Sequence, residues 1–213
     1  MREQPFPIHS LQPTQDTQPM PHATAPIVLA SASPRRSELM ALAGITCDVV
    51  PADICEDPLP GEQPDEHVMR LSREKALAAS ALTAGRFFVG ADTVVVLEER
   101  IMGKPVDEEQ AREMLESLSG RTHRVITGIT VFDRDTETCQ TKSVTTQVIF
   151  KELSKREIRD YIATGCPMDK AGAYAIQGGA VHFIRSINGS YTNVIGLPMT
   201  ELYELLQSAR ALL

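Results

Sequence analysis

The chain has 213 residues, with 28 acidic and 21 basic side chains, a formal net charge of −7 and 42% hydrophobic residues, which is typical of one globular domain or two closely joined lobes. No stretch reaches the roughly 20 apolar residues of a membrane helix and the N-terminus lacks a signal-peptide pattern, so we expect a cytoplasmic protein without membrane contact. The acidic balance argues against nucleic-acid binding, because that binding needs many cations on phosphates.

Residues 1–26 have the composition of a disordered N-terminal tail. They hold six of the fourteen prolines, four glutamines and few charges, a mixture that cannot pattern a helix or a buried strand. Residues 27–213 are therefore the predicted domain.

From Ile27 onward, short apolar runs alternate with capped helical patterns, which predicts an α/β domain. Strands are expected at 27–30, 87–97, 101–102, about 122–132 and about 141–150, with polar turns at 98–100 and 133–135. Helices are expected at 34–43, about 65–84, 107–119 and 154–164, and after Pro198. Asn188-Gly189 predicts a hairpin turn. Strands that both follow helices and pair in hairpins predict a mixed sheet.

Arg35 and Arg36 break a local rule, because they lie in the first turn of a predicted helix, where the macrodipole disfavours cations. A bound anion reverses that preference, since a helix N-terminus and two guanidinium groups together bind phosphate well. The alternative is a pair of solvated surface arginines.

Lys75 breaks the pattern of the next helix. It lies in the middle of an apolar stripe whose other members are Val68, Leu71, Ala79 and Leu82. Its ammonium group either extends outward along the helix or points into a cleft that holds negative charge.

Asp92 is the lone charge in the apolar run 87–97, which otherwise reads as a buried strand. A buried carboxylate needs a cation, a metal ion or a catalytic role, and a structural salt bridge is the alternative explanation. Lys104, in the turn after the paired strand, is a weak signal alone. Two arginines, two lysines and one buried aspartate together predict a polyphosphate site with a carboxylate for metal binding or water activation.

Other polar residues give weaker signals. Gln177 lies in a glycine-rich segment at 172–179 and offers donors and an acceptor to a base edge, although an exposed amide on a glycine-rich strand fits equally well. Asp53, Glu56 and Asp57 form an acidic loop that is either a Mg²⁺ site or simply solvated. The remaining candidates form no zinc set or triad: His67, His123, His182, and Cys47, Cys55, Cys139 and Cys166, which are expected to be reduced thiols.

Seven motifs follow one another along the chain, at 29–36, 73–76, 90–94, 103–105, 118–123, 169–178 and 188–198. With these motifs in this order, the sequence resembles the Maf family of nucleoside triphosphate pyrophosphatases, also described as septum formation inhibitors. The resemblance covers about residues 27–210. The 91–93 and 169–178 motifs resemble the branch that acts on dTTP and UTP rather than on 7-methyl-GTP, with Ala175 where many relatives have glycine.

The resemblance implies an elongated mixed sheet flanked by helices, similar to the inosine triphosphatase fold, with a cleft between two lobes. It implies Asp92 as proton acceptor, Glu56 and Asp92 as contacts of Mg²⁺ or Mn²⁺, and a homodimer. It also implies substrate-binding and specificity residues, namely Ser31, Arg35, Arg36, Lys75, Thr93, Lys104 and Gln177.

The expected reaction is metal-dependent attack of water on the α-phosphate of dTTP or UTP, with CTP or modified pyrimidine nucleotides as further substrates. The main alternative is a nucleotide-sensing regulator of cell division without turnover. A monophosphatase or phosphodiesterase, and a structural role for the arginine pair against an acidic partner, are weaker alternatives.

Overall fold

The structure is a computed structural model that describes residues 23–212. Most of the tail expected at 1–26 therefore lies outside the described residues. Ala23 pairs with Leu212 in an isolated antiparallel bridge, and Thr24 Oγ1 donates to the carbonyl of Arg210 at 2.7 Å. The start and the end of the described chain thus lie side by side.

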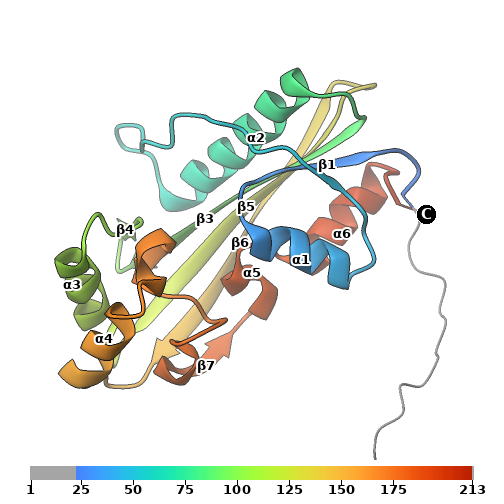
Figure 1. Cartoon of the computed structure of the whole chain (residues 1–213). Helices are drawn as coiled ribbons and strands as arrows, with labels where there is room; N and C mark the ends of the chain where they lie inside the picture. The colour runs from blue at the N-terminus through green and yellow to red at the C-terminus, as the bar shows by residue number, and fades with distance from the viewer. Residues whose placement is uncertain (1–22, 213) are drawn as a thin grey trace, which may run out of the picture.

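The described residues form a seven-stranded mixed sheet, which confirms the predicted α/β class, and the molecule is elongated along its longest strands (Figure 1). The strand order is β2-β1-β3-β5-β6-β7, and β4 pairs with β3 outside this path. Pairing is parallel for β1 with β2 and β3, and antiparallel elsewhere. The strands are β1 (Ile27–Ala30), β2 (Asp48–Val49), β3 (Phe87–Leu97), β4 (Arg100–Met102), β5 (Thr122–Asp133), β6 (Thr138–Phe150) and β7 (Ile184–Asn188).

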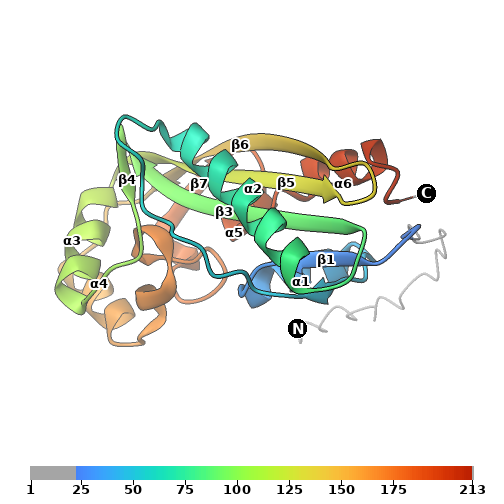
Figure 2. The ribbon, with the colours of Figure 1, turned by 90° about the horizontal axis from the view of Figure 1, so that it is seen from above.

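Helices cover both faces of the sheet. One face carries α2 and the other carries α1, α5 and α6, while α3 and α4 gather at one end of the molecule (Figures 1 and 2). The helices are α1 (Pro34–Leu42), α2 (Pro64–Leu82), α3 (Glu108–Leu118), α4 (Lys155–Ile162), α5 (Tyr191–Ile195) and α6 (Met199–Ser208). Within residues 23–212, none of these helices combines the length and the apolar character needed to cross a membrane.

The predicted hairpin at Asn188-Gly189 is wrong. Strand β7 ends at Asn188, and the chain turns into α5, where Ser190 Oγ accepts from the backbone N–H of Asn193 at 3.2 Å. Gly189 has a φ of 131°, and a Cβ there would lie 2.8 Å from Thr146 Oγ1, so this glycine passes close to β6. The residues that follow lack the alternating apolar pattern of a strand and carry a helix N-cap instead.

The glycine-rich segment is also not a strand. It begins in the 3₁₀ turn Ala171–Ala173 and continues in irregular turns, and two further 3₁₀ turns, Cys166–Asp169 and Val181–Phe183, flank it. Gly172 has a φ of 65°, and a Cβ there would lie 2.9 Å from a methyl group of Val95. The segment is therefore held against β3 rather than paired in the sheet.

Two glycines let α2 approach the sheet very closely. A Cβ on Gly90 would lie 1.9 Å from the carbonyl oxygen of Ser72, and one on Gly128 would lie 2.1 Å from that of Val68. Both glycines lie on strands that pack under α2, at positions in β3 and β5. The backbone of α2 thus lies directly against strand backbone, with no side chain between them. This close approach places Lys75, on the apolar stripe of the helix, within contact distance of Asp92.

A polar row interrupts the apolar face of the sheet midway along its longest strands. On one face of β3, Phe87, Val89 and Ala91 belong to one apolar cluster, and Val95 and Leu97 belong to another. Between them lies Thr93, which is paired in register with Thr127 of β5. Their hydroxyl oxygens are 3.0 Å apart.

Candidate active site

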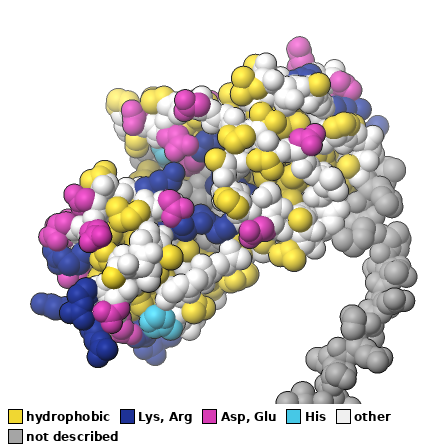
Figure 3. All heavy atoms as spheres, in the orientation of Figure 1, with side chains coloured by type: hydrophobic (Ala, Val, Ile, Leu, Met, Phe, Trp, Pro, Cys, Tyr) yellow, Lys and Arg dark blue, Asp and Glu magenta, His cyan; other side chains and the backbone are white. Residues whose placement is uncertain are grey.

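A pocket of about 350 Å³ opens over this polar row. Its charged lining comes from several elements far apart in the sequence, and the hollow is visible as a group of basic and acidic side chains on the face shown in Figure 3. The charged residues that line it are Arg35, Arg36, Glu56, Lys75, Asp92, Lys104, Asp169 and Lys170. The structure therefore brings together the two arginines, two lysines and one aspartate that were grouped from the sequence, with Glu56 of the acidic loop, and adds Asp169 and Lys170.

Lys75 points inward rather than along the helix surface. Its Nζ donates to Asp92 Oδ1 at 2.7 Å and lies 2.6 Å from Glu56 Oε1, and the lysine and aspartate residues are each only 7% exposed. The extended, solvent-seeking orientation is thus wrong for this lysine. Asp92 does form the salt bridge that was the alternative explanation, but this ion pair lies in the pocket wall and not in a sealed core.

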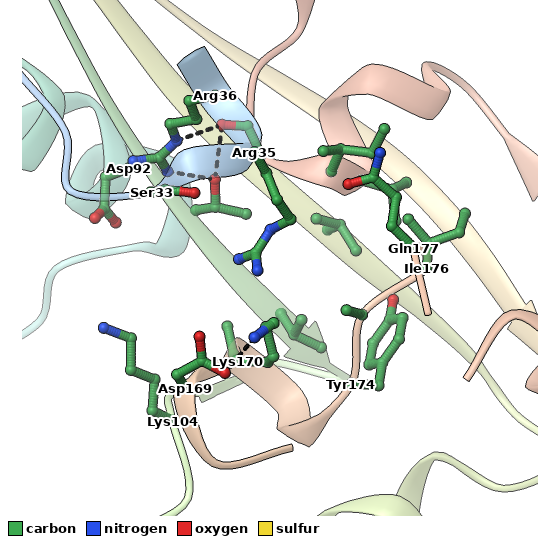
Figure 4. Close-up of a pocket in the computed structure, with 18 of the residues that line it drawn as sticks. Ser33, Arg35, Arg36, Asp92, Lys104, Asp169, Lys170, Tyr174, Ile176 and Gln177 are labelled. Atoms are coloured by element: carbon green, nitrogen blue, oxygen red, sulfur yellow. Dashed lines mark hydrogen bonds and ion pairs between the residues drawn. The ribbon is translucent and has the colours of Figure 1, made fainter. Parts of the chain in front are cut away.

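The two arginines at the start of α1 have different surroundings. Arg35 is partly buried, and its guanidinium group extends into the pocket (Figure 4). Arg36 is buried, and its guanidinium donates to Gly196 O at 2.7 Å, to Ala91 O at 2.9 Å, and at 3.0 Å to the hydroxyls of Ser31 and Thr93. Burial lowers the pKa of Arg36, and the nearby Asp92 carboxylate opposes that shift. Arg36 therefore ties α1 to three other segments while it forms part of the pocket wall.

Ser31 and Thr93 are drawn into the site by this guanidinium. Ser31 follows β1 and Thr93 lies in β3, and each presents its hydroxyl oxygen to Arg36. The sequence pattern alone gave no reason to select either hydroxyl, and only the family resemblance did so. Their role in the structure is to fix the orientation of Arg36 next to Asp92.

The opposite wall of the pocket comes from the 3₁₀ segment that follows α4. Asp169, Lys170, Tyr174 and Gln177 belong to it, with Gln177 at the end farther from Asp92, and Lys104 joins them from the loop between β4 and α3 (Figure 4). Lys170 pairs with Asp169 and was not selected from the sequence. The available signal was the adjacent charged pair before a glycine, which is a weak one.

Tyr174 is held from below by a buried histidine. His123 Nε2 lies 2.7 Å from the Tyr174 hydroxyl, and both rings pack edge-on against Phe150. Burial lowers the pKa of His123 to about 4 and raises that of Tyr174, so both groups are neutral at pH 7. His123 thus supports the pocket wall although it does not line the pocket.

Glu56 and Asp92 fit a divalent metal ion only in part. Both direct a carboxylate oxygen at the same atom, Lys75 Nζ, and hard oxygen ligands of this kind suit Mg²⁺ or Mn²⁺. Within residues 23–212 no group of three or more His, Cys, Asp or Glu side chains is arranged to hold a metal ion. Mg²⁺ is commonly bound by one or two carboxylates together with substrate phosphates, so the pair suffices only with a phosphorylated ligand.

A family model described as "Maf-like protein" matches residues 26–209, which is most of the chain. The chain belongs to the Maf family. The match confirms the resemblance inferred from the motifs, and the region it covers includes every charged residue of the pocket.

Curated relatives in this family align over nearly their whole length. A protein of Geobacter sp. (strain M21) named "dTTP/UTP pyrophosphatase" is 59% identical over 186 residues, which are 87% of this chain and 96% of that protein. A protein of the same name from Geobacter sulfurreducens is 58% identical, over 87% of this Maf chain and 97% of that protein. Another from Syntrophotalea carbinolica is 53% identical, over 85% of this chain and 83% of that protein.

Proposed function

We propose that this Maf protein is a nucleoside triphosphate pyrophosphatase that hydrolyses dTTP and UTP to the nucleoside monophosphate and pyrophosphate. The observation that carries the proposal is the buried Asp92 carboxylate in a pocket lined by five cationic side chains. Cations balance the charge of a triphosphate, and a carboxylate beside a polyphosphate weakens binding unless it holds a metal ion or activates water. The names of the curated relatives support the same substrates.

In the proposed reaction, Asp92 accepts a proton from a water molecule whose oxygen attacks the α-phosphorus. A new phosphorus–oxygen bond forms to water, and the bond from the α-phosphorus to the bridging oxygen breaks. The bridging oxygen leaves with the electron pair as part of pyrophosphate. Arg35, Lys75 and Lys104 then stabilise the charge that develops on the leaving group.

Other residues shape the site. Ser31 and Thr93 orient Arg36, and Gln177 offers hydrogen-bonding groups to the base from the far end of the pocket. Mg²⁺ or Mn²⁺, bound by Glu56, Asp92 and substrate phosphates, would supply charge neutralisation at the triphosphate. We further propose a cytoplasmic homodimer, and CTP or modified pyrimidine nucleotides as additional substrates.

The test is a panel of nucleoside triphosphates with Mg²⁺ or Mn²⁺, in which monophosphate and pyrophosphate are both quantified by chromatography. Intact pyrophosphate from dTTP and UTP is expected from the wild type, and Asp92→Asn should lose at least about a hundredfold in kcat. Asp133→Asn is a matched control, because Asp133 is a buried aspartate that pairs with an arginine, Arg86, outside the pocket.

Two results would overturn the proposal. Release of orthophosphate instead of pyrophosphate would favour a monophosphatase. Tight nucleotide binding by the wild type without any turnover would favour the nucleotide-sensing regulator.

A further inference from the structure

The segment that carries Glu56 is anchored to the apolar core at its start, where Val50 and Ala52 pack against the cluster that contains Phe88. It joins β2 to α2 over residues 50–63 and runs beside α2 before it turns into the start of that helix (Figure 1). Every residue from Cys55 to Gly61 is exposed, and Leu59 is 53% exposed. Hydrogen bonds and ion pairs therefore have to hold the part of the segment that follows Glu56 beside the pocket.

A buried ion pair supplies that hold at one end of the segment. Glu62 has a side chain only 7% exposed, and its carboxylate accepts from Arg70 Nε at 2.5 Å and from a terminal nitrogen of Arg70 at 2.8 Å. The same carboxylate accepts from the backbone N–H of Leu59 at 3.0 Å and lies 2.9 Å from His67 Nδ1. These contacts, with the Arg70 hydrogen bonds as the largest cause, hold the pKa of Glu62 well below its usual range.

Arg70 also reaches the residue next to Glu56. Its terminal nitrogen donates to the carbonyl oxygen of Asp57 at 3.1 Å. At the pocket itself, the Glu56 carboxylate lies 2.6 Å from Lys75 Nζ. Because Arg70 and Lys75 both belong to α2, one rigid helix fixes the backbone beside Glu56 and also receives its side chain.

The start of α2 does not require this ion pair. Gln63 and Glu66 form a reciprocal capping box, and Pro64 occupies the first helical position. The contacts of Glu62 and Arg70 are therefore available for a different role, which is to hold the preceding segment.

We propose that the Arg70–Glu62 ion pair positions Glu56 at the pocket by clamping the segment 50–63 onto α2. The inference rests on the proposed function in that it makes Arg70 and Glu62 positioning residues for a carboxylate of the metal and triphosphate site. Neither residue lines the pocket, so both act through Glu56.

The test compares three variants. Arg70→Lys keeps the charge but removes the planar fork that contacts Glu62 and Asp57 together. Glu62→Gln removes the negative charge of the acidic partner in the same ion pair. Arg86→Lys is the matched control, because Arg86 also makes a two-pronged contact, at 3.0 Å each, with the buried carboxylate of Asp133 outside the pocket.

The first readout is amide hydrogen exchange in residues 51–61, which does not depend on catalysis. Arg70→Lys and Glu62→Gln should each speed exchange there about tenfold, while α2 and the control variant keep wild-type exchange. Wild-type exchange in both variants would overturn the proposal, since the segment would then be held without the clamp.

The second readout is Mn²⁺ binding by electron paramagnetic resonance in the presence of α,β-imido-dUTP. Both variants should bind Mn²⁺ about tenfold more weakly than the control, as supporting residues behind a metal ligand do. Faster exchange with unchanged Mn²⁺ binding would overturn the link to Glu56. If instead the wild type failed to bind the Mn²⁺ complex, the proposed function would fail, while the exchange data would still decide whether the clamp exists.

Discussion

Replacement of Gly90 by alanine tests how closely α2 must approach the sheet. A Cβ at this position would lie 1.9 Å from the carbonyl oxygen of Ser72 and 2.8 Å from the backbone nitrogen of Ala76. Ordinary contact between such atoms begins near 3.4 Å, so the helix would have to retreat by about 1.5 Å. Both obstacles are backbone atoms, and no side-chain rotation relieves the clash.

The expected loss is about 3 kcal/mol in the free energy of unfolding, at the upper end of the usual range for overpacked sites. The sign of the change in the free energy of unfolding is informative. A glycine-to-alanine change that met no obstacle would stabilise the protein by about 0.4–1 kcal/mol, because it lowers the entropy of the unfolded chain. Withdrawal of α2 would also separate Ala76 and Ala79 from Phe88 in the apolar cluster beneath the helix.

Urea denaturation followed by circular dichroism would measure this difference. Gly103→Ala is the matched control, since a Cβ there meets nothing within 4 Å and the position lies in the loop just before Lys104. If Gly90→Ala matched or exceeded the control in stability, the close helix–sheet contact would not exist and the argument would be refuted.

Three other outcomes are expected. Because burial lowers the pKa of His123 to about 4, the unfolded state takes up a proton first as the pH falls, and about 3 kcal/mol of stability should be lost between pH 6.5 and pH 4; a His123→Gln protein with the same pH slope would contradict this. Arg36→Lys should lose about 2–4 kcal/mol, because the buried carbonyls of Gly196 and Ala91 lose donors, whereas Arg35→Lys should stay within about 0.5 kcal/mol of the wild type in thermal and urea unfolding; equal effects of the two changes would disprove the distinction. Lys75→Met should lower the free energy of unfolding by about 3 kcal/mol at pH 7, since Asp92 would be left buried without its cation, and unchanged urea unfolding would speak against it.

Much of the fold follows from local sequence signals. Pro34 begins α1, the Ser154 and Glu157 capping box begins α4, and the apolar run 87–97 forms β3 as predicted. These features depend on residues close together in the chain, so the sequence pattern was sufficient. The hairpin prediction at Asn188-Gly189 failed because the same dipeptide also suits a strand-to-helix turn, and the helix N-cap at Ser190 that follows it was overlooked.

The candidate site also combines residues that the sequence pattern indicated with contacts that it did not indicate. Lys75 and Asp92 were found because each contradicts the apolar pattern around it. Arg35 and Arg36 look equivalent in the first turn of a helix, but only Arg36 meets Gly196, which is 160 residues away in the chain. The contact of Arg70 with Asp57 gave no sequence signal, because an arginine on an exposed helix face is usually solvated.

The polar row at Thr93 and Thr127 bears on attempts to make the protein more thermostable. Valine at either position would add apolar contact between the two clusters, but it would also take a hydrogen-bond partner from a buried group, the Arg36 guanidinium at Thr93 and the Asn193 carbonyl at Thr127. Thr93 contacts Arg36 directly, and Thr127 reaches it only through Thr93. A search for heat-resistant variants should therefore retain both threonines, because the same hydroxyls stabilise the fold and orient Arg36.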